Sequence, residues 1–297
     1  MNRSNDWPAP AKLNLFLHVT GQRADGYHQL QMVFQLLDRG DTLDFVTRAD
    51  GQITRQPEIP GVLMEQDLVV RAAQALQAAS GSSYGVDIHL HKITPMGGGL
   101  GGGSSDAATT LVALNALWGC GFSEDQLAEM GLALGADVPV FVRGRSAWAE
   151  GVGEDLTPLD LPEAIFVVVC PPVSVATAEI FSAPELTRNT PKTTIPRFLS
   201  GAGRNDCESV VCARVPEVAE TLHFLREHAS VLWARMTGTG ACCFAVCASE
   251  EDANQVVNDL PQAWLDAGWS TWIAQGRNRS PLFDRLEQFQ GDEILGV

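Results

Sequence analysis

A glycine-rich stretch at residues 95–106, PMGGGLGGGSSD, constrains the fold more than any other feature of this chain. Residues 86–90 before it alternate between apolar and polar side chains, which predicts a strand, and residues 107–118 after it are typical of a helix. Glycines let backbone amides approach a ligand closely, because no Cβ atom is in the way. Serines at a helix start can cap it, and a helix N-terminus favours negative charge. The sequence therefore predicts an anion cradle between a strand and a helix, with phosphate as the expected anion.

Three other interpretations of this stretch are less favoured. A flexible linker is unexpected because regular patterns flank the glycines on both sides. A P-loop is excluded because no Gly-Lys-Ser/Thr closes the motif. Residues 97–102 have the spacing of a dinucleotide-binding loop, but the strand before them alternates and ends in Lys92 and Pro95. A strand buried in a parallel sheet would be a continuous apolar run, so we expect a phosphate loop of another kind.

The charge balance limits the class of partner. The chain has 297 residues and a formal net charge of −16. Nucleic-acid binders carry a basic face, so neither nucleic acid nor an anionic membrane is an expected partner. An acidic protein that binds phosphates must place its few cations locally, which singles out Lys12 and Lys92.

Composition also bears on location. No apolar run reaches the roughly 18 residues of a membrane helix, and the N-terminus lacks the apolar core of a signal peptide. The seven cysteines include no Cys-x-x-Cys pair. We therefore expect a cytoplasmic protein whose cysteines are small buried thiols in a reducing compartment.

The remaining pattern predicts an α+β fold with mixed or antiparallel sheets and helices on one face. Clustered Gly, Pro and Asp residues at 151–162 suggest a boundary, and hence two domains, 1–155 and 156–297. Ser123 is expected to cap a helix that ends at Gly135. The last twenty or so residues are expected to form a tail. The other elements are strands at 9–19, 27–34, 41–46 and 165–170 and helices at 68–79, 215–228 and 250–260.

Two charged residues stand in apolar surroundings. Lys12 lies inside an expected strand, either as a solvated edge residue or as a cation that serves the phosphate loop. Asp137 precedes the apolar run 138–141, either as the N-cap of a short helix or as a carboxylate able to accept a proton from a hydroxyl. A Lys–Asp pair facing a phosphate loop would suit phosphoryl transfer, which depends mostly on positioning and electrostatics.

Two further motifs have a structural and a functional interpretation each. Tyr27-His28 is either an ordinary strand aromatic with a polar neighbour or a platform for a planar ring. The segment 237–241, TGTGA, is either a tight turn or a second wall of the phosphate site.

Three motifs in order, 10–15 (PAKLNL), the glycine loop and 237–241, resemble the superfamily of galactokinase, homoserine kinase, mevalonate kinase and phosphomevalonate kinase. Residues 9–15, 23–28 (RADGYH) and 134–141 (LGADVPVF) are similar to one family within it, the kinases that act on 4-diphosphocytidyl-2-C-methyl-D-erythritol in the non-mevalonate route to isoprenoid precursors. The resemblance runs from about Trp7 to Leu282. It implies a two-domain α+β kinase fold with the active site in the interdomain cleft, residues 1–155 binding ATP and residues 156–297 binding substrate.

This resemblance also implies a reaction and a set of site residues. The γ-phosphoryl group of ATP would pass to the tertiary 2-hydroxyl of the erythritol unit, giving the 2-phosphate and ADP. Asp137 would be the general base and Lys12 its partner. Residues that would hold ATP are Asp67, Leu68, Lys92, Pro95, Met96, Gly97, Gly98, Gly99, Leu100, Gly101, Gly102, Gly103, Ser104 and Ser105. Residues that would hold the cytidine diphosphate-linked substrate are Asn14, Tyr27, His28, Thr177, Phe181, Thr239 and Gly240.

One position departs from the family pattern. The expected Asn-Leu pair near the adenine is Asp67-Leu68 here, and Asp keeps the acceptor but lacks the amide donor. Magnesium is implied by the ATP chemistry, although no carboxylate cluster identifies its ligands. The alternatives are another small-alcohol kinase of the superfamily, which would not need cytidine, and a non-catalytic nucleotide-binding protein. The presence of both Lys12 and Asp137 argues against the latter. The sequence does not determine the oligomeric state.

Overall fold

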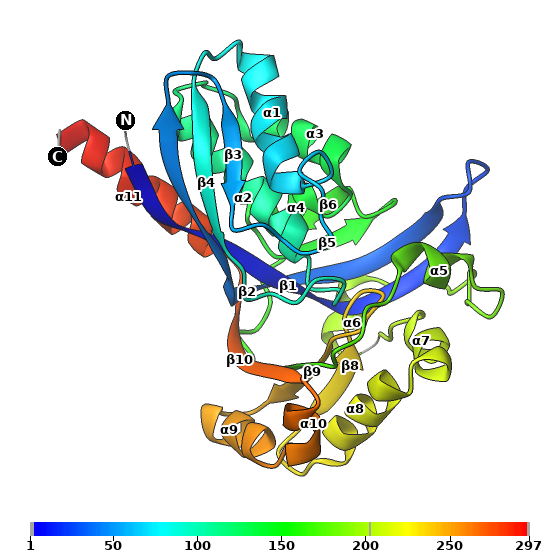
Figure 1. Ribbon diagram of the computed structural model, residues 1–297. Helices are drawn as coiled ribbons and strands as arrows, with labels where there is room; N and C mark the ends of the chain where they lie inside the picture. Colours follow the sequence, from blue (N-terminus) through cyan, green and yellow to red (C-terminus); the bar gives the residue numbers. More distant parts are fainter. Residues whose placement is uncertain (1–2, 202, 296–297) are drawn as a thin grey trace.

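Two long antiparallel strands form the centre of the fold. The computed structural model describes residues 3–201 and 203–295. Strand β1 (Arg3–Gln22) pairs with β2 (His28–Arg48) along almost its whole length (Figure 1). The sequence pattern predicted two strands where β2 is continuous, because the intervening residues 35–40 also pair with β1. Register shifts flank Lys12, which lies opposite Leu36.

The sheet is mixed, as expected. Among the described residues it has ten strands, with the main path β3-β4-β2-β10-β7-β9-β8. Each of these pairs is antiparallel except β3–β4. The shorter strands are β3 (Ile53–Gln56), β4 (Gly85–His91), β5 (Ala147–Glu150), β6 (Asp155–Pro158), β7 (Ile165–Cys170), β8 (Trp233–Met236), β9 (Cys243–Cys247) and β10 (Ser270–Arg277).

Most of the helices lie in two groups. Helices α1 to α4 pack near β3 and β4, and α7 to α10 pack near β7 to β9, while α5, α6 and α11 lie outside both groups (Figure 1). Ser123 caps α3 in a reciprocal capping box with Gln126, as its spacing predicted. The helices are α1 (Leu68–Ser80), α2 (Gly102–Leu117), α3 (Glu124–Leu134), α4 (Val138–Arg143), α5 (Thr177–Ser182), α6 (Ile195–Leu199), α7 (Glu208–Arg214), α8 (Pro216–Glu227), α9 (Glu250–Asn258), α10 (Gln262–Asp266) and α11 (Pro281–Leu295).

The prediction of a C-terminal tail is wrong. Residues 281–295 form α11, which lies beside the start of β1 (Figure 1). The ring of Phe289 lies 5.7 Å from that of Trp7, and the Arg285 guanidinium lies 4.9 Å from the Trp7 ring. The helix therefore covers an apolar stripe that the N-terminal strand would otherwise leave open. The boundary at 155/156 stays a prediction, and the structure shows that β10 pairs with both β2 and β7.

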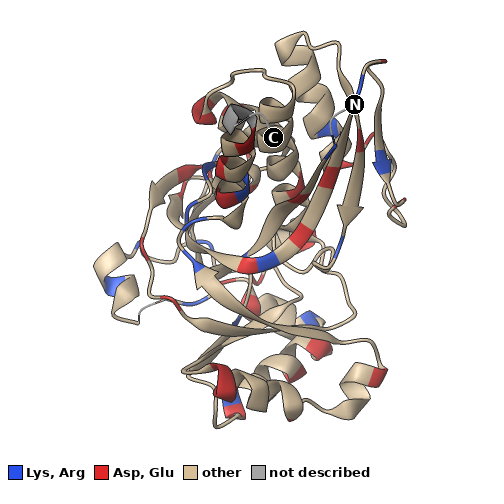
Figure 2. Cartoon of the chain, turned by 90° about the vertical axis from the view of Figure 1, so that its left-hand side faces the viewer, with Lys and Arg blue, Asp and Glu red and all other residues tan. Residues whose placement is uncertain are grey.

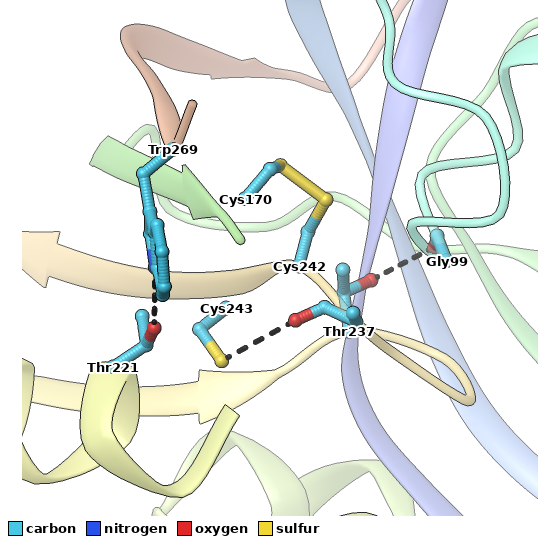
Figure 3. The surroundings of a disulfide bond; sticks show 8 residues. Gly99, Cys170, Thr221, Thr237, Cys242, Cys243 and Trp269 are labelled. Atoms are coloured by element: carbon cyan, nitrogen blue, oxygen red, sulfur yellow. Dashed lines mark hydrogen bonds between the residues drawn. A yellow bond between two sulfur atoms is a disulfide. The ribbon is translucent and has the colours of Figure 1, made fainter. Parts of the chain in front are cut away.

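The cysteine prediction is also wrong for one pair. Cys170, at the end of β7, forms a disulfide with Cys242, just before β9 (Figure 3). The two residues are 72 positions apart in sequence, and the pairing of β7 with β9 brings them together. The five other cysteines of the chain, all within the described residues, are free thiols.

Charged groups are interspersed on the surface. Figure 2 shows Asp and Glu residues on many of the elements, with Lys and Arg residues among them. In the part of the chain that the structure describes, no helix is both long and apolar enough to cross a membrane.

Candidate functional site

The glycine stretch forms a loop between β4 and α2. Alternate glycines, Gly97, Gly99 and Gly101, have φ angles of 68°, 77° and 73°. This left-handed conformation favours glycine. Gly101 is the N-cap of α2, and no side chain caps this helix among the described residues. The first N–H groups of α2 therefore face the loop without a side-chain acceptor, as an anion site requires.

The two serines lie differently from the prediction. Ser104 and Ser105 are in the first turn of α2 and do not cap it. The helix starts earlier than expected because glycines 102 and 103 already adopt helical geometry. Ser105 is fully buried, and its Oγ has no hydrogen-bond partner within residues 3–201 and 203–295.

The second glycine turn, residues 237–241, packs against the glycine loop. The Thr237 hydroxyl donates to the Gly99 carbonyl at 3.1 Å (Figure 3). The Cys242 amide donates to the Gly98 carbonyl at 3.1 Å. A Cβ atom on Gly99 would overlap the Thr237 carbonyl oxygen. Because only a residue without a side chain fits there, the two glycine segments pack directly against each other.

A cavity of about 380 Å³ opens above the loop. It is lined by Pro95 to Ser104 and by Asp67, Leu68 and Lys92, all of which the family resemblance predicts at ATP. The Asp67 carboxylate already binds two other groups of the protein. Its carboxylate caps α1 through the Val69 amide at 2.8 Å and binds the buried Arg55 guanidinium at 2.7 Å. Asp67 thus orders the wall of this cavity through contacts to the α1 backbone and to Arg55.

Lys92 lies between two buried carboxylates beneath the loop. Its Nζ donates to Asp41 at 2.5 Å and to Asp106 at 2.9 Å. Burial raises the pKa of Asp106 to about 8, and the neighbouring Asp41 charge raises it further while Lys92 opposes the shift. Asp106 is therefore mostly protonated at neutral pH, so the Asp41–Lys92–Asp106 cluster carries no net charge next to the loop.

Lys12 and Asp137 meet beside the loop. Lys12 is only 3% exposed, so the interpretation as a solvated edge residue is wrong. Strand β1 pairs with β2 on one side, and the glycine loop covers the other, where the Lys12 amide donates to the Leu100 carbonyl at 2.9 Å. Its Nζ lies 3.4 Å from Asp137 Oδ2 and donates to Asn14 Oδ1 at 2.5 Å and to the Gly99 carbonyl at 2.9 Å. Asp137 occupies the N-cap position of α4, but among the described residues its side chain makes no capping hydrogen bond. Its carboxylate is free to act on a ligand.

An aromatic pocket lies on the side of the Lys12–Asp137 pair away from the glycine loop. The rings of His28 and Phe181 stack with centroids 5.1 Å apart, and Tyr27 is 65% exposed beside them. Arg188 Nε donates to His28 Nε2 at 3.1 Å, so the ring proton of neutral His28 is on Nδ1. Burial, and then the Arg188 charge, lower the pKa of His28. The imidazole is therefore neutral near pH 7.

Three cavities form a continuous series. The aromatic pocket, about 570 Å³, contains Tyr27, His28, Thr177 and Phe181. A smaller cavity of about 210 Å³ contains Lys12, Asn14, Asp137 and Thr239. It shares Thr177 and Phe181 with the aromatic pocket and Gly99 and Gly101 with the loop cavity. The Lys12–Asp137 pair thus lies between the phosphate loop and the aromatic pocket.

Some predicted residues lie at the edge of this arrangement. The Thr177 and Thr239 hydroxyls are hydrogen-bonded to each other at 2.9 Å. Gly240 is outside the residues that line the three cavities, as is Ser105. Sequence reasoning missed Arg188, whose contacts to His28 cross 160 positions, and missed Asp41, 51 positions from Lys92. Asp106 stood next to the serines and could have been noticed.

Two family models and several known kinases are similar to this chain in sequence. Residues 67–145 match the model of the GHMP kinases N terminal domain, and residues 190–266 match that of the GHMP kinases C terminal. A 4-diphosphocytidyl-2-C-methyl-D-erythritol kinase from Halorhodospira halophila is 58% identical over 279 residues, which covers 93% of this chain and 94% of that protein. One from Azoarcus sp. is 55% identical and covers 94% and 96%. This chain belongs to the family of 4-diphosphocytidyl-2-C-methyl-D-erythritol kinases. It is therefore a kinase, an enzyme of isoprenoid biosynthesis.

Solved structures agree with the fold. The crystal structure of a 4-(cytidine 5'-diphospho)-2C-methyl-D-erythritol kinase superposes on this kinase with a TM-score of 0.78 at 32% identity, covering 93% of this chain and 99% of that one. A mevalonate kinase superposes with a TM-score of 0.66 at 13% identity, covering 94% and 100%, which shows a shared fold alone.

Proposed function

We propose that this kinase phosphorylates the 2-hydroxyl of 4-diphosphocytidyl-2-C-methyl-D-erythritol with Asp137 as general base and Lys12 as the cation of the reacting centre. One observation supports this most strongly. The Lys12–Asp137 contact of 3.4 Å lies in the small cavity that joins the phosphate loop to the aromatic pocket. A linear substrate with a base at one end would place its alcohol between them.

Asp137 would remove the proton of the alcohol. The freed oxygen would then attack the γ-phosphorus of ATP, and the bond to the β-phosphate oxygen would break to release ADP. Lys12, held by Asn14 and the Gly99 carbonyl, would keep Asp137 in place and stabilise the charge that develops on the transferred group. Its fixed position means that little reorganisation accompanies the reaction.

The loop cavity would hold ATP. Amides of the glycine loop and of the first turn of α2 are suited to bind phosphate oxygens. Lys92 would line the ATP site, in the position beside the loop that its contacts to Asp41 and Asp106 fix. Leu68 would line the adenosine end, whereas Asp67 would shape it through Arg55.

The aromatic pocket would hold the cytosine. Stacking of a base on an aromatic ring contributes about 1–3 kcal/mol. Tyr27 offers an exposed ring face, while Phe181 already stacks on His28. Neutral His28 would present its Nδ1–H as a donor to the base. Thr177 and Thr239 would lie along the path towards Asp137.

Magnesium is the remaining expectation. Within residues 3–201 and 203–295 no three His, Cys, Asp or Glu side chains gather as a metal site. The described residues therefore offer no preformed cage for the ion. We propose that Mg²⁺ arrives bound to ATP, with phosphate oxygens and water as its main ligands.

Two broader predictions accompany the reaction. We propose that residues 1–155 form the ATP-binding part and residues 156–297 the substrate-binding part. Strand β10 and helix α11 belong to the second range but contact β2 and β1 of the first. We also propose that the protein acts in the cytoplasm, where ATP is available.

A comparison of substrates tests the proposal. Release of ADP would be measured with the cytidylated substrate, with 2-C-methyl-D-erythritol 4-phosphate and with homoserine. We expect efficient turnover of the first compound alone. If the uncytidylated phosphate reacted equally well, the pocket at Tyr27 would not hold the nucleobase and a general small-alcohol kinase would be the better description.

A further inference from the structure

A separate cavity lies on the face of β1 opposite to the face that carries Lys12. Its volume is about 440 Å³, which is within the range of about 300–1,000 Å³ for small-molecule sites. Leu15 of β1 lines it, whereas Lys12 and Asn14 line the reacting centre. Successive side chains of a strand point to opposite faces. The cavity shares no lining residue with the three cavities of the active site.

The walls of this cavity are mainly apolar and partly aromatic. Phe166 of β7, Phe198 of α6 and Trp233 of β8 come from three different elements. Trp233 is 39% exposed and Leu199 is 50% exposed at the same cavity, so the pocket is reached from solvent. A flat apolar body would bury surface on Phe198 and Trp233, whereas Phe166, only 1% exposed, forms part of the wall.

One cation lines this apolar pocket. The Arg235 guanidinium donates to the carbonyls of Leu15 and Gly203, the latter at 2.7 Å, and lies 5.0 Å from the Trp233 ring. In the part of the chain that the structure describes, no carboxylate pairs with Arg235 within the 4.0 Å of an ion pair. The groups in direct contact with it are two carbonyls and a ring face, whereas the Glu208 charge acts on it from beyond ion-pair distance.

Glu208 acts on Arg235 through its charge, but its two oxygens bind other groups, Arg226 at 2.5 Å and the Met236 amide at 3.0 Å. Burial lowers the pKa of Arg235, and the Glu208 charge opposes this shift. A half-buried cation without a carboxylate, in an apolar pocket, is complementary to an anion with an apolar body.

We propose that this cavity is a binding site for a small anionic amphiphile, with its apolar body between Phe198 and Trp233 and its acidic group at Arg235. This proposal does not depend on the reaction proposed above. Its position links it to the active site, because Arg235 holds the Leu15 carbonyl in the strand that carries Lys12. Strand β8 also leads directly into Thr237, which supports the glycine loop.

Two fluorescent probes test this site. One is 1-anilinonaphthalene-8-sulfonate, an aromatic anion, and the other is N-phenyl-1-naphthylamine, which has the same rings without charge. We expect the full-length protein to bind the sulfonate at least about tenfold more tightly, since a hydrogen bond to a charged group contributes that much. Energy transfer from tryptophan to the bound sulfonate should fall in the Trp233→Phe variant, which locates the probe.

Variants distinguish the role of charge from that of folding. Arg235→Met should lose about tenfold in affinity for the sulfonate and keep its affinity for the neutral probe, which reports that the apolar pocket is intact. Arg235→Lys should recover most of the loss. Arg197→Met, which removes an exposed cation from the same helix as Phe198, should change neither affinity.

Three results would overturn the proposal. The first is equal affinity for the two probes. The second is an Arg235→Met variant that binds the sulfonate like Arg197→Met. The third is energy transfer that is unchanged in the Trp233→Phe variant, since the probe would then be bound elsewhere.

Discussion

Replacing Asp137 with Asn separates catalysis from folding in this kinase. The amide has nearly the size of the carboxylate, but it cannot accept the proton of the alcohol. The loss of a general base typically costs about 10²–10⁴ in rate. At 1.36 kcal/mol for each tenfold, this corresponds to about 2.7–5.4 kcal/mol of transition-state stabilisation.

The expected cost in stability is much smaller. The Asp137 side chain is 35% exposed, and ion pairs with an exposed member contribute about 0–1 kcal/mol. Lys12 keeps its contacts to Asn14 and to the Gly99 carbonyl. A loss of about 1 kcal/mol lowers Tm by about 2–4 °C in a chain of roughly this size. The variant should therefore fold and bind both substrates while turning over very slowly.

The assay compares three quantities for the wild-type protein and Asp137→Asn. These are kcat from ADP release, Kd for the cytidylated substrate from calorimetry, and Tm. Asp125→Asn is a matched control, because Asp125 is 83% exposed and pairs with Arg143 on the surface. We expect the control to be unchanged in all three.

A variant with kcat within a few-fold of the wild type would refute the reasoning. Asp137 would then serve only to orient Lys12. Loss of substrate binding together with kcat would also contradict it, because the base was argued to act only on the reacting hydroxyl.

Three further predictions follow from the site. Lys12→Met should lower kcat with little change in the KM for ATP, because Lys12 contacts Asp137 and not the adenosine end; steady-state kinetics would show this, and an unchanged kcat would count against it. Asp106→Asn should flatten the pH dependence of stability. The folded pKa of about 8 lies above the ordinary 3.8, so the native state holds a proton that the unfolded chain has released. Stability from this group is present at low pH and falls as pH rises from about 4 through 8; urea unfolding at pH 6 and 8 measures it, and equal slopes for both proteins would contradict the assignment. Arg188→Met should raise the KM for the cytidylated substrate and leave the KM for ATP unchanged, because Arg188 fixes only His28 and the segment around Phe181. Equal effects on both KM values would indicate a general loss of structure instead.

Local sequence signals predicted the frame of this protein well. The capping box at Ser123, the strand at 165–170 and the start of α1 after Asp67 are where the patterns placed them. Each depends on neighbours within a few residues, which propensity and capping chemistry describe directly. The glycine stretch likewise predicted a loop between a strand and a helix.

Contacts between distant segments were beyond those signals. The pairing of Cys170 with Cys242, the helix at 281–295 and the continuous β2 all depend on which strand or surface lies alongside. The same holds for Asp67, which family resemblance placed near adenine and which the fold joins to Arg55.

The sequence by itself determined where the backbone can approach another group closely, through the glycines, and which two charged residues stand in apolar segments. Only the tertiary structure decided that Lys12 meets Asp137, that Arg188 fixes the proton of His28, and that Arg235 faces an apolar cavity without a carboxylate. The physical reason is the range of the forces involved. Helix caps and turns are decided within one chain segment, whereas ion pairs and cavities require side chains that only the packing of separate elements brings within a few ångströms.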